Sequence, residues 1–180
     1  MRRISRLKII TFFCLLLFGA CNDILFDKPQ PGWIHENLKS FPGQLQGLYY
    51  NGHDTIEVKE NRITQFNAEK KEDDLVLSDS LIFRMDGKNY FLNFREENTW
   101  TVFLLSDMGD SVVTFELKSN DEKVRSKLNS ITEVHKIKGI DSEEPEYLIK
   151  PGDEEFRKIL DANLFSTSET YHRLVVKKEK

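Results

Sequence analysis

From Phe41 onward, apolar and polar residues alternate with the two-residue period of half-buried β-strands. The alternation is clearest over 55–59, where Ile56 and Val58 fall on one face. The dipeptide Asn51-Gly52 precedes this stretch and is typical of a hairpin turn, because both positions tolerate positive φ. The same pattern predicts further short strands at 45–50, 63–66, 81–84, 90–94, 99–105 and 112–117.

The stretch from 81 to 117 predicts an antiparallel meander, because its strands follow one another through very short turns. Phe91, Phe103 and Leu105 are expected on one face, so parts of the sheet should be covered on both sides. The other face is expected to carry alternate apolar residues of three strands, namely Tyr90, Leu92, Phe94, Trp100, Val102, Leu104, Val113, Phe115 and Leu117. The charged stretch 69–74 is expected to be a loop.

Two short helices are predicted to interrupt the β pattern. Asn120 is a candidate cap for a helix over 121–131, with Leu128 on its apolar stripe, and a second helix is expected over 153–163. Further strands are expected at 134–138, 147–149 and 171–176. The fold class is therefore mainly β with some α. It is a strongly bent antiparallel meander, closed or half closed as a lipocalin-like barrel, with two helices at one end or edge.

The N-terminus has the three parts of an export signal. Four basic residues lie within positions 2–8, an apolar run covers 9–18, and the small residues Gly19 and Ala20 mark a cleavage site before Cys21. A transmembrane anchor is the competing interpretation, but a spanning helix needs about 20 apolar residues, and this run is about half that long. Residues 1–20 are therefore predicted to be a signal peptide.

Residues 17–21 resemble the lipobox of bacterial lipoproteins. The resemblance implies that Cys21 receives a diacylglyceryl group, that the signal is removed, and that the new terminus is acylated. More than one acyl chain holds a protein to a membrane stably. The alternative is an ordinary signal with a chance cysteine. The predicted organisation is a lipidated Cys21 with a tether over 21–40, one β-rich domain over 41–177 and a frayed tail over 178–180.

Several stretches also resemble small exported lipoproteins of the Bacteroidota. They are the runs 90–94 and 100–105, the proline-containing stretch 27–31 and the acidic helix start 154–156. This resemblance implies an exported lipoprotein and carries over no catalytic residues. Asn22 follows the cysteine and Asp23 comes one residue later, which favours the outer membrane over the inner membrane under the sorting rule for lipoproteins.

Charge and cysteine content narrow the possible functions. The chain carries a formal net charge of −4 at pH 7, and the predicted signal contains basic but no acidic residues, so the mature chain is more acidic still. This balance argues against a nucleic-acid partner and against adhesion to anionic lipid by charge. Cys14 and Cys21 are the only cysteines, so the mature domain is expected to lack disulfides and thiolate-bound metals.

No motif for catalysis or cofactor binding stands out, and no metal or cofactor is expected. The four histidines are not paired at metal-binding spacing; they are His35, His53, His135 and His172. There is no Gly-x-Ser-x-Gly elbow and no P-loop. Acidic clusters could form a carboxylate pair for glycoside hydrolysis or, at Asp107 and Asp110, a weak calcium site. Turn formation and solubility are the simpler explanation; the other clusters are 72–74, 143–146 and 153–155.

Aromatic residues in the strands could line a ligand cavity, although core packing is the simpler account. The candidates for lining such a cavity are Tyr50, Tyr90 and Trp100, together with Tyr49 and Phe103. We therefore expect a membrane-tethered envelope lipoprotein with a non-enzymatic accessory role and a possible envelope protein partner. A lipocalin-like small-ligand binder is the first alternative, and a hydrolase using paired carboxylates is the second.

Overall fold

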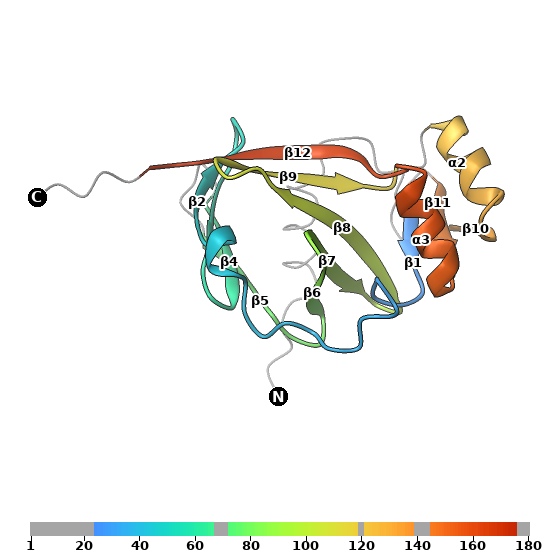
Figure 1. Cartoon of the computed structure of the whole chain (residues 1–180), viewed down its shortest axis with the longest axis horizontal. Helices are drawn as coiled ribbons and strands as arrows, with labels where there is room; N and C mark the ends of the chain where they lie inside the picture. Colours follow the sequence, from blue (N-terminus) through green and yellow to red (C-terminus); the bar gives the residue numbers. More distant parts are fainter. Residues whose placement is uncertain (1–23, 67–71, 119–120, 139–144, 176–180) are drawn as a thin grey trace, which may run out of the picture.

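The computed structural model describes residues 24–66, 72–118, 121–138 and 145–175, and in them the chain is mainly β (Figure 1). The described strands belong to one 12-stranded mixed sheet. The strands are β1 Ile24–Phe26, β2 Gly47–Tyr50, β3 Thr55–Val58, β4 Arg62–Phe66, β5 Glu72–Val76, β6 Leu81–Asp86, β7 Asn89–Glu96, β8 Thr99–Asp107, β9 Ser111–Glu116, β10 Val134–Lys138, β11 Pro145–Ile149 and β12 Ser166–Arg173. The helices are η1 Gly43–Leu45, α2 Glu122–Asn129 and α3 Asp153–Asp161.

The sheet bends into a half-open barrel, as the sequence predicts. Its strands follow the order β6-β7-β8-β9-β12-β2-β3-β4-β5, and each neighbouring pair in this run is antiparallel. The barrel does not close, because in the described chain β6 meets the segment after β5 only through a bridge between Ser78 and Leu81. Figure 1 shows β2, β4 and β5 on the side of the curved sheet opposite the helices.

A second branch leaves the barrel at β8. There β1 pairs antiparallel with β8 and parallel with β11, and β10 lies outermost. The parallel pair makes the sheet mixed, whereas the sequence predicts an antiparallel one. Helices α2 and α3 lie on this side of the molecule (Figure 1). Both are stabilised at their N-termini by acidic side chains, since Asp121 accepts a hydrogen bond from Lys123 N and Glu155 accepts one from Gly152 N.

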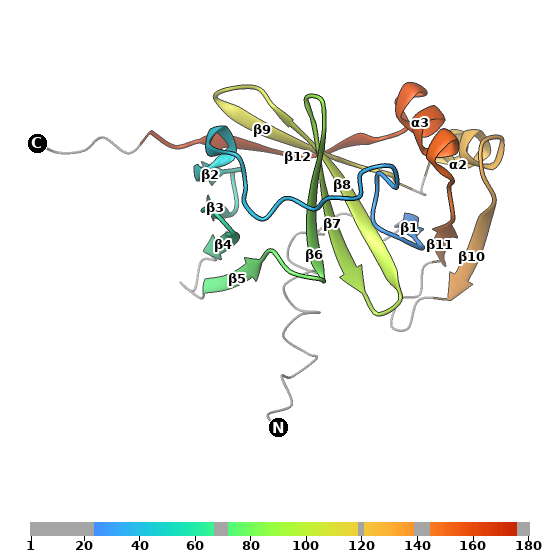
Figure 2. The ribbon, with the colours of Figure 1, turned by 60° about the horizontal axis from the view of Figure 1, so that its bottom comes forward.

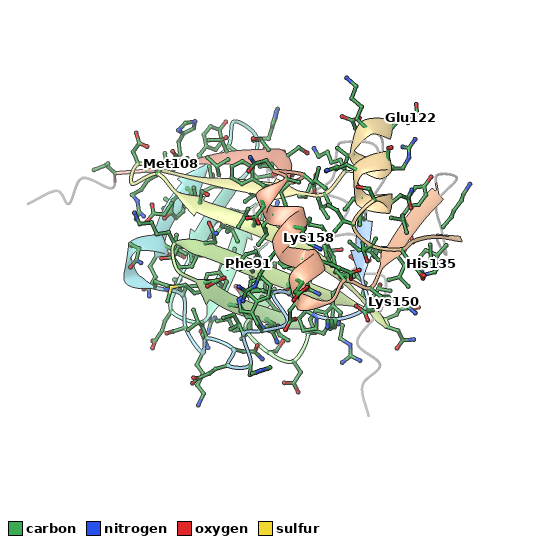
Figure 3. The ribbon with its side chains drawn as sticks, turned by 45° about the vertical axis from the view of Figure 1, so that its right-hand side comes forward. Phe91, Met108, Glu122, His135, Lys150 and Lys158 are labelled. Atoms are coloured by element: carbon green, nitrogen blue, oxygen red, sulfur yellow. The ribbon has the colours of Figure 1, made fainter. Side chains whose placement is uncertain are left out.

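Two apolar cores share the sheet. One lies under the helices, where Phe156 of α3 contacts the rings of Phe26 and Phe91; Figure 3 shows α3, which carries Lys158, crossing the sheet near Phe91. The other lies inside the barrel and includes Tyr49, Leu92 and Phe103. The central strands are thus covered on both sides, as predicted.

The register corrects the predicted faces of the meander. Leu92 pairs with Phe103 and Phe91 pairs with Leu104, so Leu92 shares the barrel-side face with Phe103 rather than with Leu104. The alternation within each strand was sufficient to separate its two faces. It could not tell which face of one strand continues the face of the next, because that depends on the register set by the turn.

The predicted tether is corrected from Ile24 onward. Ile24, Leu25 and Phe26 are buried in β1. The chain after them, residues 27–37, crosses β6 and forms a strap (Figure 2). Asn93 of β7 is fully buried and holds this strap. Its Oδ1 accepts a hydrogen bond from Gln30 N at 2.7 Å, and its Nδ2 donates to Gln30 O at 2.9 Å. The prolines of the strap indicated an irregular chain, but not the buried polar partners that fix it.

Arg84 of β6 holds the strap at a second point. Its Nη1 donates to the carbonyl oxygens of Pro29 and Pro31 at 2.8 Å, and its Nε donates to Asn37 Oδ1 at 2.9 Å. Burial lowers the pKa of the guanidinium. Trp33 completes the attachment by donating to Asp86 Oδ2 and packing against the helix side.

Smaller differences concern the ends of elements. The charged stretch predicted as a loop contains β5, and β12 begins at Ser166 and ends at Arg173 instead of covering 171–176. Polar residues can occupy β5 because its other edge is unpaired with any described strand and open to water. Gly19, Ala20, Cys21 and the tail 178–180 lie outside the described residues.

Candidate ligand-binding cavity

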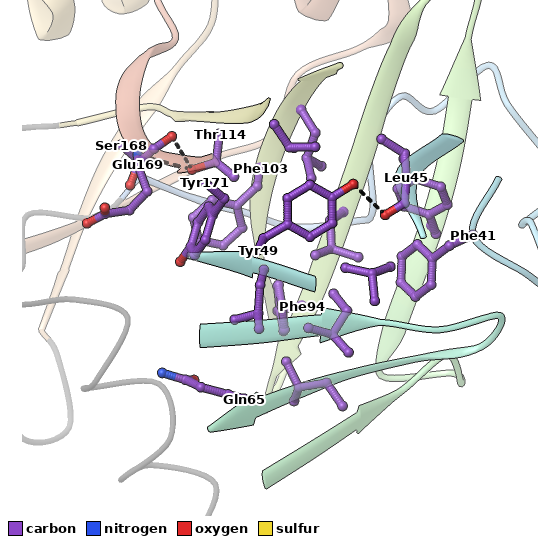
Figure 4. A pocket seen from close by; sticks show the side chains of 18 residues that line it. Phe41, Leu45, Tyr49, Gln65, Phe94, Phe103, Thr114, Ser168, Glu169 and Tyr171 are labelled. Carbon is purple, nitrogen blue, oxygen red and sulfur yellow. Dashed lines mark hydrogen bonds between the residues drawn. The ribbon is translucent and has the colours of Figure 1, made fainter. Parts of the chain in front are cut away.

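The half-open barrel encloses an apolar cavity of about 110 Å³. Side chains from β2 to β9 and from β12 line it, and most of them are aliphatic or aromatic. Figure 4 shows the cavity from close by, with Phe41 and Leu45 at one end and Gln65, Glu169 and Tyr171 toward the other. An apolar space with a few polar groups at one end is the usual form of a small-ligand site.

Strand alternation places the lining residues. Ile56 and Val58 of β3 point inward, as the sequence predicts, and Ile56 pairs with Gln65 of β4. Ile63 of β4 pairs with Leu75 of β5, and both line the cavity. Gln65 therefore occupies a position in the strand pattern that would ordinarily carry an apolar residue.

Hydrogen bonds of Tyr49 lie at the end of the cavity near Leu45. The buried Tyr49 hydroxyl donates to Leu45 O at 2.9 Å, and Arg173 Nη2 donates to the same hydroxyl at 2.6 Å. The guanidinium of Arg173 also lies 4.8 Å from the centre of the Tyr49 ring. Burial raises the pKa of Tyr49, and the nearby positive charge of Arg173 opposes this. Gly47 permits the arrangement, because a Cβ there would lie 2.7 Å from Arg173 Nη1.

The opposite end carries the polar side chains. Gln65 is only 4% exposed, and within the described chain neither Oε1 nor Nε2 of its amide has a hydrogen-bond partner. Ser168 and Glu169 both line the cavity because the β12 register shifts between Thr167 and Glu169, which interrupts strict alternation. This end therefore combines a free neutral amide with a half-buried carboxylate.

Tyr171 adds a hydroxyl to this end. Burial raises its pKa, the charges of Glu169 and Asp54 raise it further, and a hydrogen bond with Asn51 acts in the opposite direction. The phenol therefore stays protonated at neutral pH. Asn51 also donates to Glu169 Oε2 at 3.3 Å, which fixes the carboxylate beside the cavity.

The three aromatic residues predicted to line a cavity lie elsewhere. Tyr50 is 41% exposed and donates to Gly52 O, and Trp100 belongs to the core under the helices. Tyr90 is buried in the barrel-side core, where it stacks on Phe83 and accepts a hydrogen bond from Gln44, but it does not line the cavity. Tyr49 and Phe103, also considered from the sequence, do line it.

Several acidic residues considered from the sequence make hydrogen bonds within their own turn or to a neighbouring strand, and residues 143–144 of one acidic cluster lie outside the described residues. Asp107 and Asp110 accept hydrogen bonds from Gly109 N and from Ser111 Oγ, as expected for turn residues. Asp74 accepts one from Thr64 Oγ1 on the neighbouring strand. Within the described residues, no three His, Cys, Asp or Glu side chains are placed to hold a metal ion.

No protein-family model, curated protein or solved structure matches the chain. No helix in the described ranges is long and apolar enough to span a bilayer.

Proposed function

We propose that this protein is a cell-envelope lipoprotein whose domain binds a small, mainly apolar ligand in the barrel cavity. The supporting observation is the cavity itself, which is lined by apolar side chains and has polar groups at one end. A structural core would be expected to fill this space, because protein interiors pack densely and voids destabilise them.

The cavity volume sets the scale of the ligand. At about 110 Å³, it is close to the roughly 150 Å³ cavity that accepts benzene in an engineered protein, so a ligand segment of about six carbon atoms fits. Burial of six methylenes contributes about 5 kcal/mol, which corresponds to a dissociation constant between about 0.1 and 1 mM for a simple alkyl probe. A larger natural ligand would extend through the open side of the barrel.

Membrane attachment through Cys21 is the second part of the proposal. It is supported by the export signal and by the small residues before the cysteine. Only Asn22 and Asp23 separate Cys21 from Ile24, the first residue of β1. Lipidation of Cys21 would therefore hold the barrel close to the bilayer, with the outer membrane favoured, where apolar small molecules concentrate.

Calorimetric titration with 1-hexanol tests the cavity, and β5 offers a matched pair of variants. Leu75 lines the cavity, whereas the next residue, Val76, is exposed. We expect Leu75→Phe to weaken binding by about tenfold, because its larger ring displaces roughly two methylenes of ligand. Val76→Phe should change the affinity by less than about twofold.

The fold of each variant is checked by circular dichroism, and Ile63→Phe fills the same space if Leu75→Phe does not fold. Absence of hexanol binding to the wild type would contradict the proposal. Equal binding by the wild type and the folded cavity-filling variants would contradict it too, because the probe would then bind elsewhere.

An accessory role through a protein partner is the second candidate. It is supported by exposed apolar side chains of Met108, Leu174 and Val175. Backbone hydrogen bonds hold the chain around Leu174 beside its neighbours, since Arg173 N donates to Asp110 O and Leu174 N donates to Leu48 O. Under this role, Met108→Asp should reduce chemical cross-linking of the protein to an envelope partner without changing hexanol binding.

A further inference from the structure

The Gln65 amide has no hydrogen-bond partner among the described residues, and this bears on the ligand that the proposed cavity would take. A buried polar group without a hydrogen bond destabilises a protein by about 1–3 kcal/mol. Gln65 lines the cavity, and both polar atoms of its amide are unpaired. An apolar residue would suit the same inward position. Because buried polar groups are normally hydrogen-bonded, we expect the amide to bind a partner that enters the cavity.

The amide has an NH2 group, which donates, side by side with a carbonyl oxygen, which accepts. A ligand that presents the complementary pair, an acceptor next to a donor, satisfies both atoms at once. A primary amide has this arrangement. An alcohol can satisfy both atoms only if its single hydroxyl donates and accepts together, and a carboxylate offers no donor.

The charge at this end favours a neutral ligand over an anionic one. Glu169 lines the cavity on the same side as Gln65 in Figure 4. Tyr171 stays neutral because burial and the nearby carboxylates raise the pKa of its phenol. Among the described residues that line the cavity there is no Lys or Arg. A carboxylate head group would therefore meet like charge without a cation to balance it.

We infer that the cavity, if it binds ligands as proposed above, selects a neutral carboxamide whose head group pairs with the Gln65 amide. The apolar part of the ligand lies toward Phe41 and Tyr49, where the cavity is closed by hydrogen-bonded side chains. The cavity thus recognises both the apolar tail and the head group of the ligand.

The test compares hexanamide, 1-hexanol and hexanoate at pH 7.5 by calorimetry. We expect the wild type to bind hexanamide about 2- to 13-fold more tightly than 1-hexanol, because one extra hydrogen bond contributes about 0.5–1.5 kcal/mol. Hexanoate should bind more weakly than either. Gln65→Leu should lose the preference for hexanamide over 1-hexanol.

Gln44→Leu is the matched control, since Gln44 is exposed and does not line the cavity. It should keep the order of the three ligands. If 1-hexanol and hexanamide bind equally, or if Gln65→Leu keeps the preference, the head-group inference is overturned while the cavity proposal stands. If none of the ligands binds, the cavity proposal fails, and the inference fails with it.

Discussion

Replacing Gln65 by leucine should make the ligand-free protein more stable. Gln65 is only 4% exposed, and neither polar atom of its amide has a partner among the described residues. Leucine is similar in size and requires no hydrogen bond. Removing the unpaired amide should raise the free energy of unfolding by about 1–3 kcal/mol. For a domain of this length, that corresponds to an increase of about 2–10 °C in the melting temperature.

The assay is urea unfolding followed by the fluorescence of Trp33 and Trp100, with equal slopes in both proteins as the condition for comparison. Gln46→Leu is the matched control, because the Gln46 amide donates to Phe41 O at 2.8 Å. This control should lower the free energy of unfolding by about 0.5–1.5 kcal/mol. If Gln65→Leu lowers it instead, the Gln65 amide is hydrogen-bonded in solution and the reasoning is refuted.

Three further predictions concern the strap, the cavity and the anchor. Asn93→Ala should lower the free energy of unfolding in urea by about 2–4 kcal/mol, because it leaves Gln30 N and O without their partner, whereas Asn98→Ala in an exposed turn should stay within about 0.5 kcal/mol. Above pH 10, the free energy of unfolding should fall, because the unfolded Tyr171 phenol ionises near its usual pKa of about 10 while burial keeps the folded phenol protonated. The free energy of unfolding of Tyr171→Phe should fall less steeply with pH, and an identical decline in both proteins would contradict this. Cys21→Ala should move the protein from the membrane fraction to the soluble fraction, and unchanged retention would argue against a lipid anchor.

The barrel was predictable where local pattern decides structure. Strands such as 90–94 and 99–105 alternate clearly and are joined by short turns, so the meander β6 to β9 follows from the sequence. The two helices were predictable from their apolar stripes, whereas the cap of α2 is Asp121 and not the predicted Asn120. Their ends differ by a few residues from the predicted ranges, which is expected where helices fray.

The strap and β1 were not predictable by the same means. Ile24 to Phe26 is only three residues long, too short for a periodic signal, and its partners β8 and β11 are far away in sequence. The hydrogen bonds of Asn93 and Arg84 to the strap are also long-range. Nothing in the local sequence distinguishes these buried polar residues from solvated ones.

The cavity could be predicted only in part. The sequence indicated an aromatic-lined cavity as an alternative to a filled core. Tyr49 and Phe103 do line the cavity, but Tyr50 and Trp100 do not. Their placement depends on register and on which branch of the sheet each strand joins. Gln65 did leave a signal, since it interrupts an inward apolar row that contains Ile63. Its lack of partners became apparent only in three dimensions.

Methyl NMR during a titration with 1-hexanol tests the central claim most directly, because the protein contains two separate apolar cores. We predict saturable shifts for the methyl groups of Ile56, Ile63 and Val112, which line the cavity. The methyl groups of Leu128 and Ile159, which lie in the core under the helices, should not shift. Shifts spread equally over both cores, or none in the barrel, would contradict a ligand-binding cavity.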